Sequence, residues 1–120
     1  MNTKLNDNLK PNKVEVLDFR NSQFIQLPEI LSKFTNLKTL YLSNCRSLQN
    51  VDGLANCTKL IELDLYGCKS LRDVNGIANL PNLKKLDVTL GSIAIPYSIF
   101  KMWSRSSVEL YQQRIRKSMK

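Results

Sequence analysis

The sequence of 120 residues contains no histidine, the side chain that most often serves as a general base or as a zinc ligand. It also lacks a phosphate-cradling glycine-rich loop, a metal-spaced cluster and a nucleophile paired with a base. These absences disfavour an enzyme. We expect a non-catalytic protein with no metal and no cofactor, and with no small-molecule substrate.

Cysteine is also scarce, and its count bears on the cellular compartment. The three cysteines are an odd number and do not form the even framework of a small secreted protein, which favours free thiols in a reducing compartment. Residues 1–13 lack the apolar segment and the small-residue cleavage site of a secretory signal. If residue 1 is the native start, export by a signal peptide is not expected, and the cytoplasm is the predicted location.

Long apolar runs are absent as well. No stretch approaches the length of a membrane-spanning helix, so we expect a soluble protein. A length of 120 residues suits one domain, and 42% hydrophobic residues suffice for a packed core.

What the sequence does contain is a repeated unit of 23 residues. The pattern Leu-x-x-Leu-x-Leu-x-x-Cys begins at Leu37 and again at Leu60, and a third copy opens at Leu83. The apolar spacing of the same unit begins at Val14, which lies 23 residues before Leu37. Self-similarity at a fixed period indicates stacked supersecondary units rather than a closed globule.

The repeats divide the chain into three parts. Residues 1–13 are a polar lead-in or thin cap, and residues 14–102 form four repeats, of which the last is degenerate because 93–102 match 25–34 with one residue deleted. Residues 103–120 form a C-terminal cap. In this cap, Val108–Leu110 predicts a short fifth strand before a basic helical turn at 112–117, although the apolar spacing also fits a helix.

Each repeat predicts one short strand that is buried on one face. Apolar residues at positions four and six alternate with outward residues at positions three, five and seven. Stacked in parallel about 4.8 Å apart, such strands form a curved sheet. The predicted inner layer consists of Leu17, Phe19, Leu40, Leu42, Leu63, Leu65, Leu86 and Val88.

The pattern Leu-x-x-Leu-x-Leu-x-x-Cys, followed by spaced leucine and valine and by Asp-Gly or Asn-Gly, resembles the leucine-rich repeat family over residues 14–102. The cysteine at position nine is similar to that of plant immune-receptor repeats, and the unit is also similar to internalin repeats. The resemblance implies an α/β solenoid: a short right-handed superhelix with a parallel concave sheet and short convex 3-10 or helical turns. For function, it implies mainly binding.

The cysteines and turn residues have predicted structural roles. Cys45 and Cys68 fall one period apart and are expected to support loop carbonyls and amides as the family's asparagine ladder does, and Cys57 is expected in the core. A redox pair or metal site is the less favoured alternative. Asp52 and Asn75 are expected to cap the convex turns, with a glycine after each to permit a tight backbone.

The outward strand residues define a predicted partner-binding surface on the concave face. Three members of its position-five row are acidic in a chain whose net charge is +8. This row and two tyrosines predict docking of a basic or amphipathic segment of another protein, the alternative being a solvated face of mixed charge. The predicted site is Asp18, Arg20, Lys38, Tyr41, Ser43, Glu62, Asp64, Tyr66, Lys85, Asp87 and Thr89. If Val108–Leu110 is a strand, Ser107, Glu109 and Tyr111 extend these rows.

The C-terminal tail carries much of the positive charge. From residue 101 onward, six basic residues face one acidic residue, which suggests binding to nucleic acid or an anionic membrane surface. A solubilising end cap is the favoured alternative, because no row of stacking aromatics accompanies the charges. The residues assigned to this weaker polyanion site are Arg114, Arg116, Lys117 and Lys120.

The leading functional prediction is therefore a protein–protein interaction module. A second hypothesis is an effector that an intracellular bacterium delivers into a host cell without a signal peptide. Lysine outnumbers arginine two to one and asparagine is abundant, as in proteins from AT-rich genomes. Small leucine-rich repeat proteins without signal peptides resemble such effectors.

Overall fold

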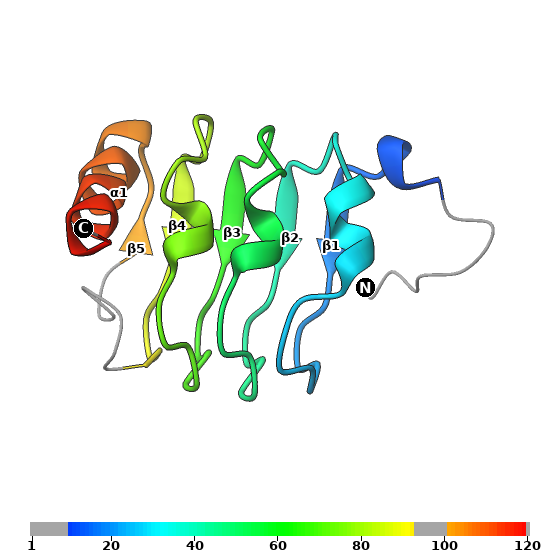
Figure 1. Cartoon of the computed structure of the whole chain (residues 1–120), viewed down its shortest axis with the longest axis horizontal. Coiled ribbons are helices and arrows are strands. Elements are labelled where there is room, and N and C mark those ends of the chain that lie inside the picture. The colour runs from blue at the N-terminus through cyan, green and yellow to red at the C-terminus, as the bar shows by residue number, and fades with distance from the viewer. Residues whose placement is uncertain (1–9, 93–100, 120) are drawn as a thin grey trace.

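The computed structural model describes residues 10–92 and 101–119 of the chain, and in them a single sheet runs along the molecule. The strands lie in chain order: β1 (Val16–Asp18), β2 (Thr39–Tyr41), β3 (Glu62–Asp64), β4 (Lys85–Asp87) and β5 (Lys101–Met102). Short 3-10 helices lie on the return segments: η1 (Pro11–Lys13), η2 (Glu29–Lys33), η3 (Asp52–Leu54) and η4 (Asn75–Ile77). Helix α1 (Arg105–Ser118) lies beside β5 at the C-terminal end of the stack (Figure 1).

The register of the sheet follows the sequence repeat. Leu17 pairs with Leu40, and Leu40 with Leu63, in parallel strands that are each one period apart. Strand β5 instead runs antiparallel to β4, with Met102 opposite Leu86. The four repeat strands are thus parallel as predicted, and the antiparallel strand β5, which leads into α1, was not predicted. A parallel sheet with 3-10 turns is compatible with a solenoid, and the handedness of the superhelix stays a prediction.

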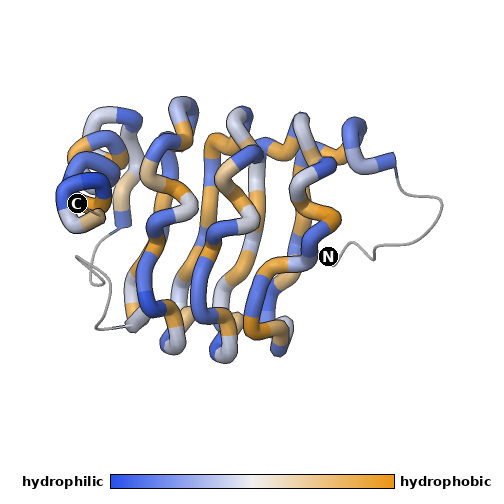
Figure 2. Tube along the Cα trace, in the orientation of Figure 1, coloured by the Kyte–Doolittle hydropathy of each residue, from blue (hydrophilic) through white to orange (hydrophobic). Residues whose placement is uncertain are grey.

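The core lies between the sheet and the return segments. Every predicted inner-layer residue is buried: Leu17, Phe19, Leu40, Leu42, Leu63, Leu65, Leu86 and Val88. Leucine, valine and isoleucine residues of the return segments close the core from the other side, and Figure 2 shows hydrophobic and hydrophilic residues alternating along the coils. Removing one such leucine side chain would cost about 2 to 5 kcal/mol.

The convex turns begin differently from the prediction. Asp52 and Asn75 lie inside the first turns of η3 and η4, and their N–H groups donate to the Oδ1 atoms of Asn50 (3.0 Å) and Asp73 (2.9 Å). The expected capping by Asp52 and Asn75 is therefore wrong. An Asn or Asp side chain reaches the N–H two residues ahead, so the capping residue precedes the turn. At Gly76 a Cβ would lie 2.1 Å from the Val51 carbonyl oxygen, so the stacking of adjacent coils requires glycine there.

One corner of each coil adopts the left-handed backbone conformation. The φ angles are 64° at Asn21, 59° at Asn44, 70° at Gly67 and 51° at Leu90, and these residues are 23 positions apart. Asparagine and glycine tolerate this region, whereas leucine does not. Leu90 therefore holds a strained conformation at an exposed corner.

Helix α1 covers the end of the hydrophobic core. Ser104 caps it by accepting the Ser107 N–H at 3.2 Å, and Val108, Tyr111 and Ile115 are buried. The predicted strand at Val108–Leu110 is wrong, because these residues form the first turns of the helix. The Val-Glu-Leu alternation fits a strand, but the cap at Ser104 and the spacing of the buried residues favour the helix.

Polar side chains of α1 also satisfy the carbonyl groups of the last coil. Arg105 Nη1 donates to Leu83 at 2.7 Å, and Gln112 Nε2 donates to Ile77 and Leu80 at 2.7 and 2.8 Å. Arg116 Nη1 donates to Ala78 at 2.5 Å. Glu109 bridges the two arginines, at 2.9 Å from each. The helix thus replaces the hydrogen bonds that a further coil would supply.

Candidate interaction surface

The exposed sheet face consists of the strand residues that point away from the core and the residues that follow each strand. Its rows are set by the register, which aligns Thr39 with Glu62 and Lys85, and Tyr41 with Asp64 and Asp87. Arg20, Ser43, Tyr66 and Thr89 follow the strands as expected. Lys38 lies just before β2, with its Nζ 3.6 Å from a Glu15 carboxylate oxygen. The structure therefore gathers the predicted partner-binding residues other than Lys38 on this face, although not all of them are accessible.

Asp18 is the predicted member that is not accessible. Its side chain is 4% exposed and accepts hydrogen bonds from Arg20 Nε at 2.9 Å and from Arg20 Nη2 at 2.5 Å. These bonds hold the pKa of the Asp18 carboxyl well below its usual range, although burial acts in the opposite direction. The Arg20 guanidinium also lies 5.6 Å from the centroid of the Tyr41 ring. Contrary to the prediction, Asp18 does not offer its carboxylate to a partner.

The other acidic members of the row stabilise the turns after their strands. Asp64 Oδ1 accepts the Tyr66 N–H, and Asp87 Oδ1 accepts the Thr89 N–H, both at 2.9 Å. Thr89 Oγ1 adds a 2.5 Å bond to Asp87. Each aspartate therefore has a partly structural role. The sequence could have indicated this role, because an aspartate two residues before a turn residue commonly accepts that residue's N–H.

The two carboxylates differ in their electrostatic environment. Burial raises the pKa of Asp64, the Tyr66 N–H lowers it, and the neighbouring charge of Asp87 raises it again. This result agrees with the like-charge arrangement that the register predicts. Asp87 Oδ2 lies 3.9 Å from Lys101 Nζ on β5, a long ion pair between partly exposed groups.

Trp103 is a member of this face that the sequence reasoning missed. It follows β5, its surface is 61% exposed, and the Lys85 Nζ lies 5.8 Å from its ring centroid. The register places Glu62 beside Lys85 as predicted, but the Lys85 ammonium group lies over the indole. Tyr111, which an additional strand would have exposed, is buried. No pattern in the sequence signalled the antiparallel return that places Trp103 here.

A small cleft lies between Trp103 and the last two parallel strands. Its volume is about 60 Å³. Its lining consists of Glu62, Leu63, Asp64, Lys85, Leu86, Asp87 and Trp103. Carboxylates and an aromatic ring thus meet at the C-terminal end of the exposed sheet face.

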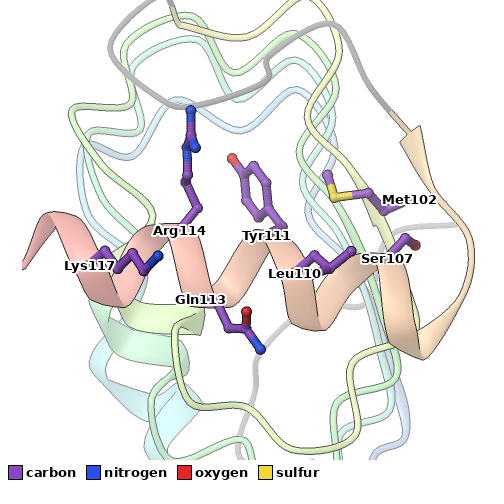
Figure 3. A pocket seen from close by; sticks show the side chains of 7 residues that line it. All are labelled: Met102, Ser107, Leu110, Tyr111, Gln113, Arg114 and Lys117. Atoms are coloured by element: carbon purple, nitrogen blue, oxygen red, sulfur yellow. The ribbon is translucent and has the colours of Figure 1, made fainter.

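The residues of the predicted polyanion site are divided by the structure. Arg116 belongs to the cap hydrogen-bond network, whereas Arg114 and Lys117 border a groove of about 480 Å³ beside α1 (Figure 3). The groove is lined by Met102, Ser107, Leu110, Tyr111, Gln113, Arg114 and Lys117. Lys120, like the degenerate-repeat residues 93–100, lies outside the described residues. In the described tail, Arg114 and Lys117 remain as candidates for binding an anion.

The cysteines are structural, as the ladder prediction requires. Cys45 Sγ donates to the Phe19 carbonyl at 3.2 Å, and Cys68 Sγ donates to the Leu42 carbonyl at 3.1 Å. Burial raises the pKa of both thiols, that of Cys68 to about 12. Cys57 is buried in the core as predicted. Such thiols are poor nucleophiles at neutral pH.

The described residues form neither a metal cluster nor a membrane-spanning helix. Within residues 10–92 and 101–119, no group of three histidine, cysteine, aspartate or glutamate side chains is arranged to hold a metal ion. No helix in these ranges has the length and apolar character needed to cross a membrane.

Comparison with known proteins gives one result for the repeats. Residues 35–79 match the family profile described as "Leucine Rich repeats (2 copies)". No curated protein matches the chain at a significant level. The matched segment runs from before β2 to just after η4, and so includes the centre of the exposed sheet face.

Proposed function

We propose that the chain is a protein-interaction module that binds its partner on the exposed sheet face, because residues 35–79 match the leucine-rich repeat family, whose domains are generally non-catalytic and mediate protein–protein interaction. One observation carries the proposal. Tyr41, Tyr66 and Trp103 retain accessible surface on a face whose other members, apart from Val16, are polar, and none of the three belongs to the buried core. Accessible aromatic side chains are the usual anchors of protein interfaces.

The charges on this face favour a basic or amphipathic partner segment. Glu62, Asp64 and Asp87 lie together although the whole chain has a net charge of +8. A partner with basic residues would be attracted to these carboxylates and repelled by the lysine-rich and arginine-rich remainder of the surface. Electrostatics would therefore select the face as well as the partner.

The dimensions of the face limit the size of the bound segment. Five strands about 4.8 Å apart span about 19 Å, which about six residues of extended chain can cross. This contact is smaller than the roughly 20 to 30 residues per side of a standard interface. We therefore expect a dissociation constant of about 1 to 100 μM rather than nanomolar binding.

A bait experiment tests the proposal. The wild-type chain and a Tyr41→Ala/Tyr66→Ala variant are immobilised, and proteins retained from a lysate of the encoding organism are compared. Asp73→Asn is the control, because Asp73 lies on the return segment. A partner retained by the wild type and the control but lost from the tyrosine variant is the expected result. Equal retention by all three proteins would place the partner elsewhere.

The polyanion alternative rests on Arg114 and Lys117, which border the groove beside α1. Removing the tail would also remove the cap, so point substitutions give the sharper test. Arg114→Gln/Lys117→Gln should weaken salt-sensitive retention on heparin more than Arg46→Gln/Lys69→Gln, which removes equal charge from exposed loop residues. Equal losses would indicate only non-specific attraction.

The cytoplasmic location and the alternative of a delivered effector stay predictions. A translocation-reporter fusion tests the effector hypothesis directly. Signal from the host cytosol that depends on a dedicated secretion system would support it, and no signal would favour a role inside the producing cell.

A further inference from the structure

The N-terminal half of the exposed sheet face already contains a bound arginine, which the chain supplies itself. Arg20 donates two hydrogen bonds to the Asp18 carboxylate through Nε and Nη2, at 2.9 and 2.5 Å. Its guanidinium lies 5.6 Å from the Tyr41 ring centroid, on the neighbouring strand. A carboxylate that ends one strand and an aromatic ring on an adjacent strand thus form a complete arginine-binding unit.

The C-terminal half contains the same two partners without the arginine. Asp64 and Asp87 occupy the row of Asp18, and Trp103 supplies an aromatic ring that is 61% exposed. The residues that correspond to Arg20 are Tyr66 and Thr89, which carry no positive charge. The two aspartates and Trp103 line one cleft of about 60 Å³.

We propose that this cleft binds an arginine side chain of the protein partner. The proposal rests on the proposed function, since the arginine belongs to the segment that docks on the exposed sheet face. The guanidinium would stack on the Trp103 ring and donate hydrogen bonds to Asp64 and Asp87. Asp64 Oδ1 already accepts the Tyr66 N–H, so the second oxygen of that carboxylate is the acceptor assigned to the partner.

Size and charge both fit a guanidinium. The cleft of about 60 Å³ has room for more than the single water molecule that needs about 10 to 15 Å³. Three carboxylates and one lysine line it, and a second lysine outside the lining pairs with one of the carboxylates, which leaves a formal charge of −1 that one arginine neutralises. The acidic members are Glu62, Asp64 and Asp87, and the basic members are Lys85 and Lys101.

Arginine is favoured over lysine because of geometry. A planar guanidinium can stack on an indole and make paired hydrogen bonds to a carboxylate at the same time, which an ammonium group cannot. Lys85 lies over the ring at 5.8 Å and shows that the ring attracts a cation. Its side chain is exposed, so it can move into solvent when a guanidinium enters.

The test uses the fact that Trp103 is the sole tryptophan of the chain. Its fluorescence is measured while the full chain is titrated with acetyl-Gly-Arg-Gly-amide, or with the matched peptide that contains uncharged citrulline. We expect a saturable change with the arginine peptide and none with the citrulline peptide. Equal responses to the two peptides, or no response to either, would overturn the proposal.

Asp64→Asn identifies the carboxylate without disrupting the turn, since asparagine keeps the oxygen that accepts the Tyr66 N–H. The dissociation constant of the arginine peptide should rise about fivefold or more in this variant. It should not change in Asp73→Asn, where the substituted carboxylate lies on the return segment. An unchanged dissociation constant in Asp64→Asn would show that Asp64 does not bind the arginine side chain.

Failure of this proposal and failure of the proposed function can be distinguished. If the partner requires Tyr41 and Tyr66 but binds Asp64→Asn normally, the proposed interface is supported and the arginine cleft is wrong. If the arginine peptide changes the fluorescence but the partner binds the tyrosine variant normally, the arginine cleft is supported and the proposed interface is wrong.

Discussion

Replacing Leu90 should stabilise the protein, although it removes an apolar side chain. Leu90 has a φ of 51°, and its counterparts one, two and three periods earlier are Gly67, Asn44 and Asn21. Asparagine adopts this conformation with little strain, because its short polar side chain can hydrogen-bond locally. Leu90→Asn therefore restores the residue type that two other corners use.

The expected gain follows from two opposing terms. The left-handed conformation costs an ordinary L-residue about 1 to 2 kcal/mol. Leu90 is 62% exposed, so removing it loses only part of the about 1.5 to 3 kcal/mol that a fully buried leucine contributes. The difference predicts a free energy of unfolding higher by about 0.5 to 1 kcal/mol, and a melting temperature higher by about 2 to 6 °C.

Guanidinium chloride unfolding followed by circular dichroism measures this change. Leu110→Asn is the control, because Leu110 is similarly exposed, at 67%, but lies within α1. The control should be destabilised by about 1 kcal/mol, because it loses helix propensity and the partial burial of the leucine side chain. If Leu90→Asn lowered the midpoint as much as Leu110→Asn does, the strain assigned to the fourth corner would be refuted.

The remaining predictions concern the cap, the buried carboxylate and the thiols. Gln112→Leu should lower the free energy of unfolding by about 1 to 3 kcal/mol in urea titrations, because the Ile77 and Leu80 carbonyls each lose one donor and keep the Leu80 N–H and Arg105 Nη1, respectively, and no measurable destabilisation would contradict the stabilising role of the cap. The ionised Asp18 has a depressed pKa, so its stabilisation is complete above the unfolded pKa of about 3.9 and is lost as pH falls toward the folded value. Melting temperatures should therefore fall more from pH 5 to pH 2 in the wild type than in Asp18→Asn, and parallel profiles would exclude this linkage. Cys68, with its pKa raised to about 12, should react with iodoacetamide at pH 8 far more slowly in the folded chain than in guanidinium chloride, and equal rates would show that the thiol is accessible.

The coil structure could be predicted because each repeat provides an independent reading of the same pattern. Leu17, Leu40, Leu63 and Leu86 occupy equivalent positions, so an error in one copy would conflict with the others. The register and the buried layer follow from this periodicity.

The C-terminal cap could not be predicted in the same way because it occurs once. The Val108-Glu109-Leu110 alternation suits a strand as well as the first turns of a helix. The choice depends on the Ser104 cap and on packing of Val108 and Tyr111 against the last coil. Packing against a distant segment leaves no local signal in the sequence.

The candidate site could be predicted only in part, for a related reason. Register places Tyr41, Glu62 and Asp64 on one face, but it does not show how each side chain is used. Asp18 is occupied by Arg20, and Trp103 joins the face only because β5 returns antiparallel to β4. Side-chain pairing and a strand reversal are tertiary features, so they required the structure.

We expect this protein to bind its partner through the exposed sheet face. Titration calorimetry with the recovered partner tests it most directly, using Tyr41→Ala/Tyr66→Ala beside the wild type and Asp73→Asn. We predict a dissociation constant raised at least about 30-fold in the tyrosine variant, as for interface residues that each contribute strongly, and an unchanged constant in the control. Equal affinity of all three proteins, with each shown to be folded by circular dichroism, would contradict the claim.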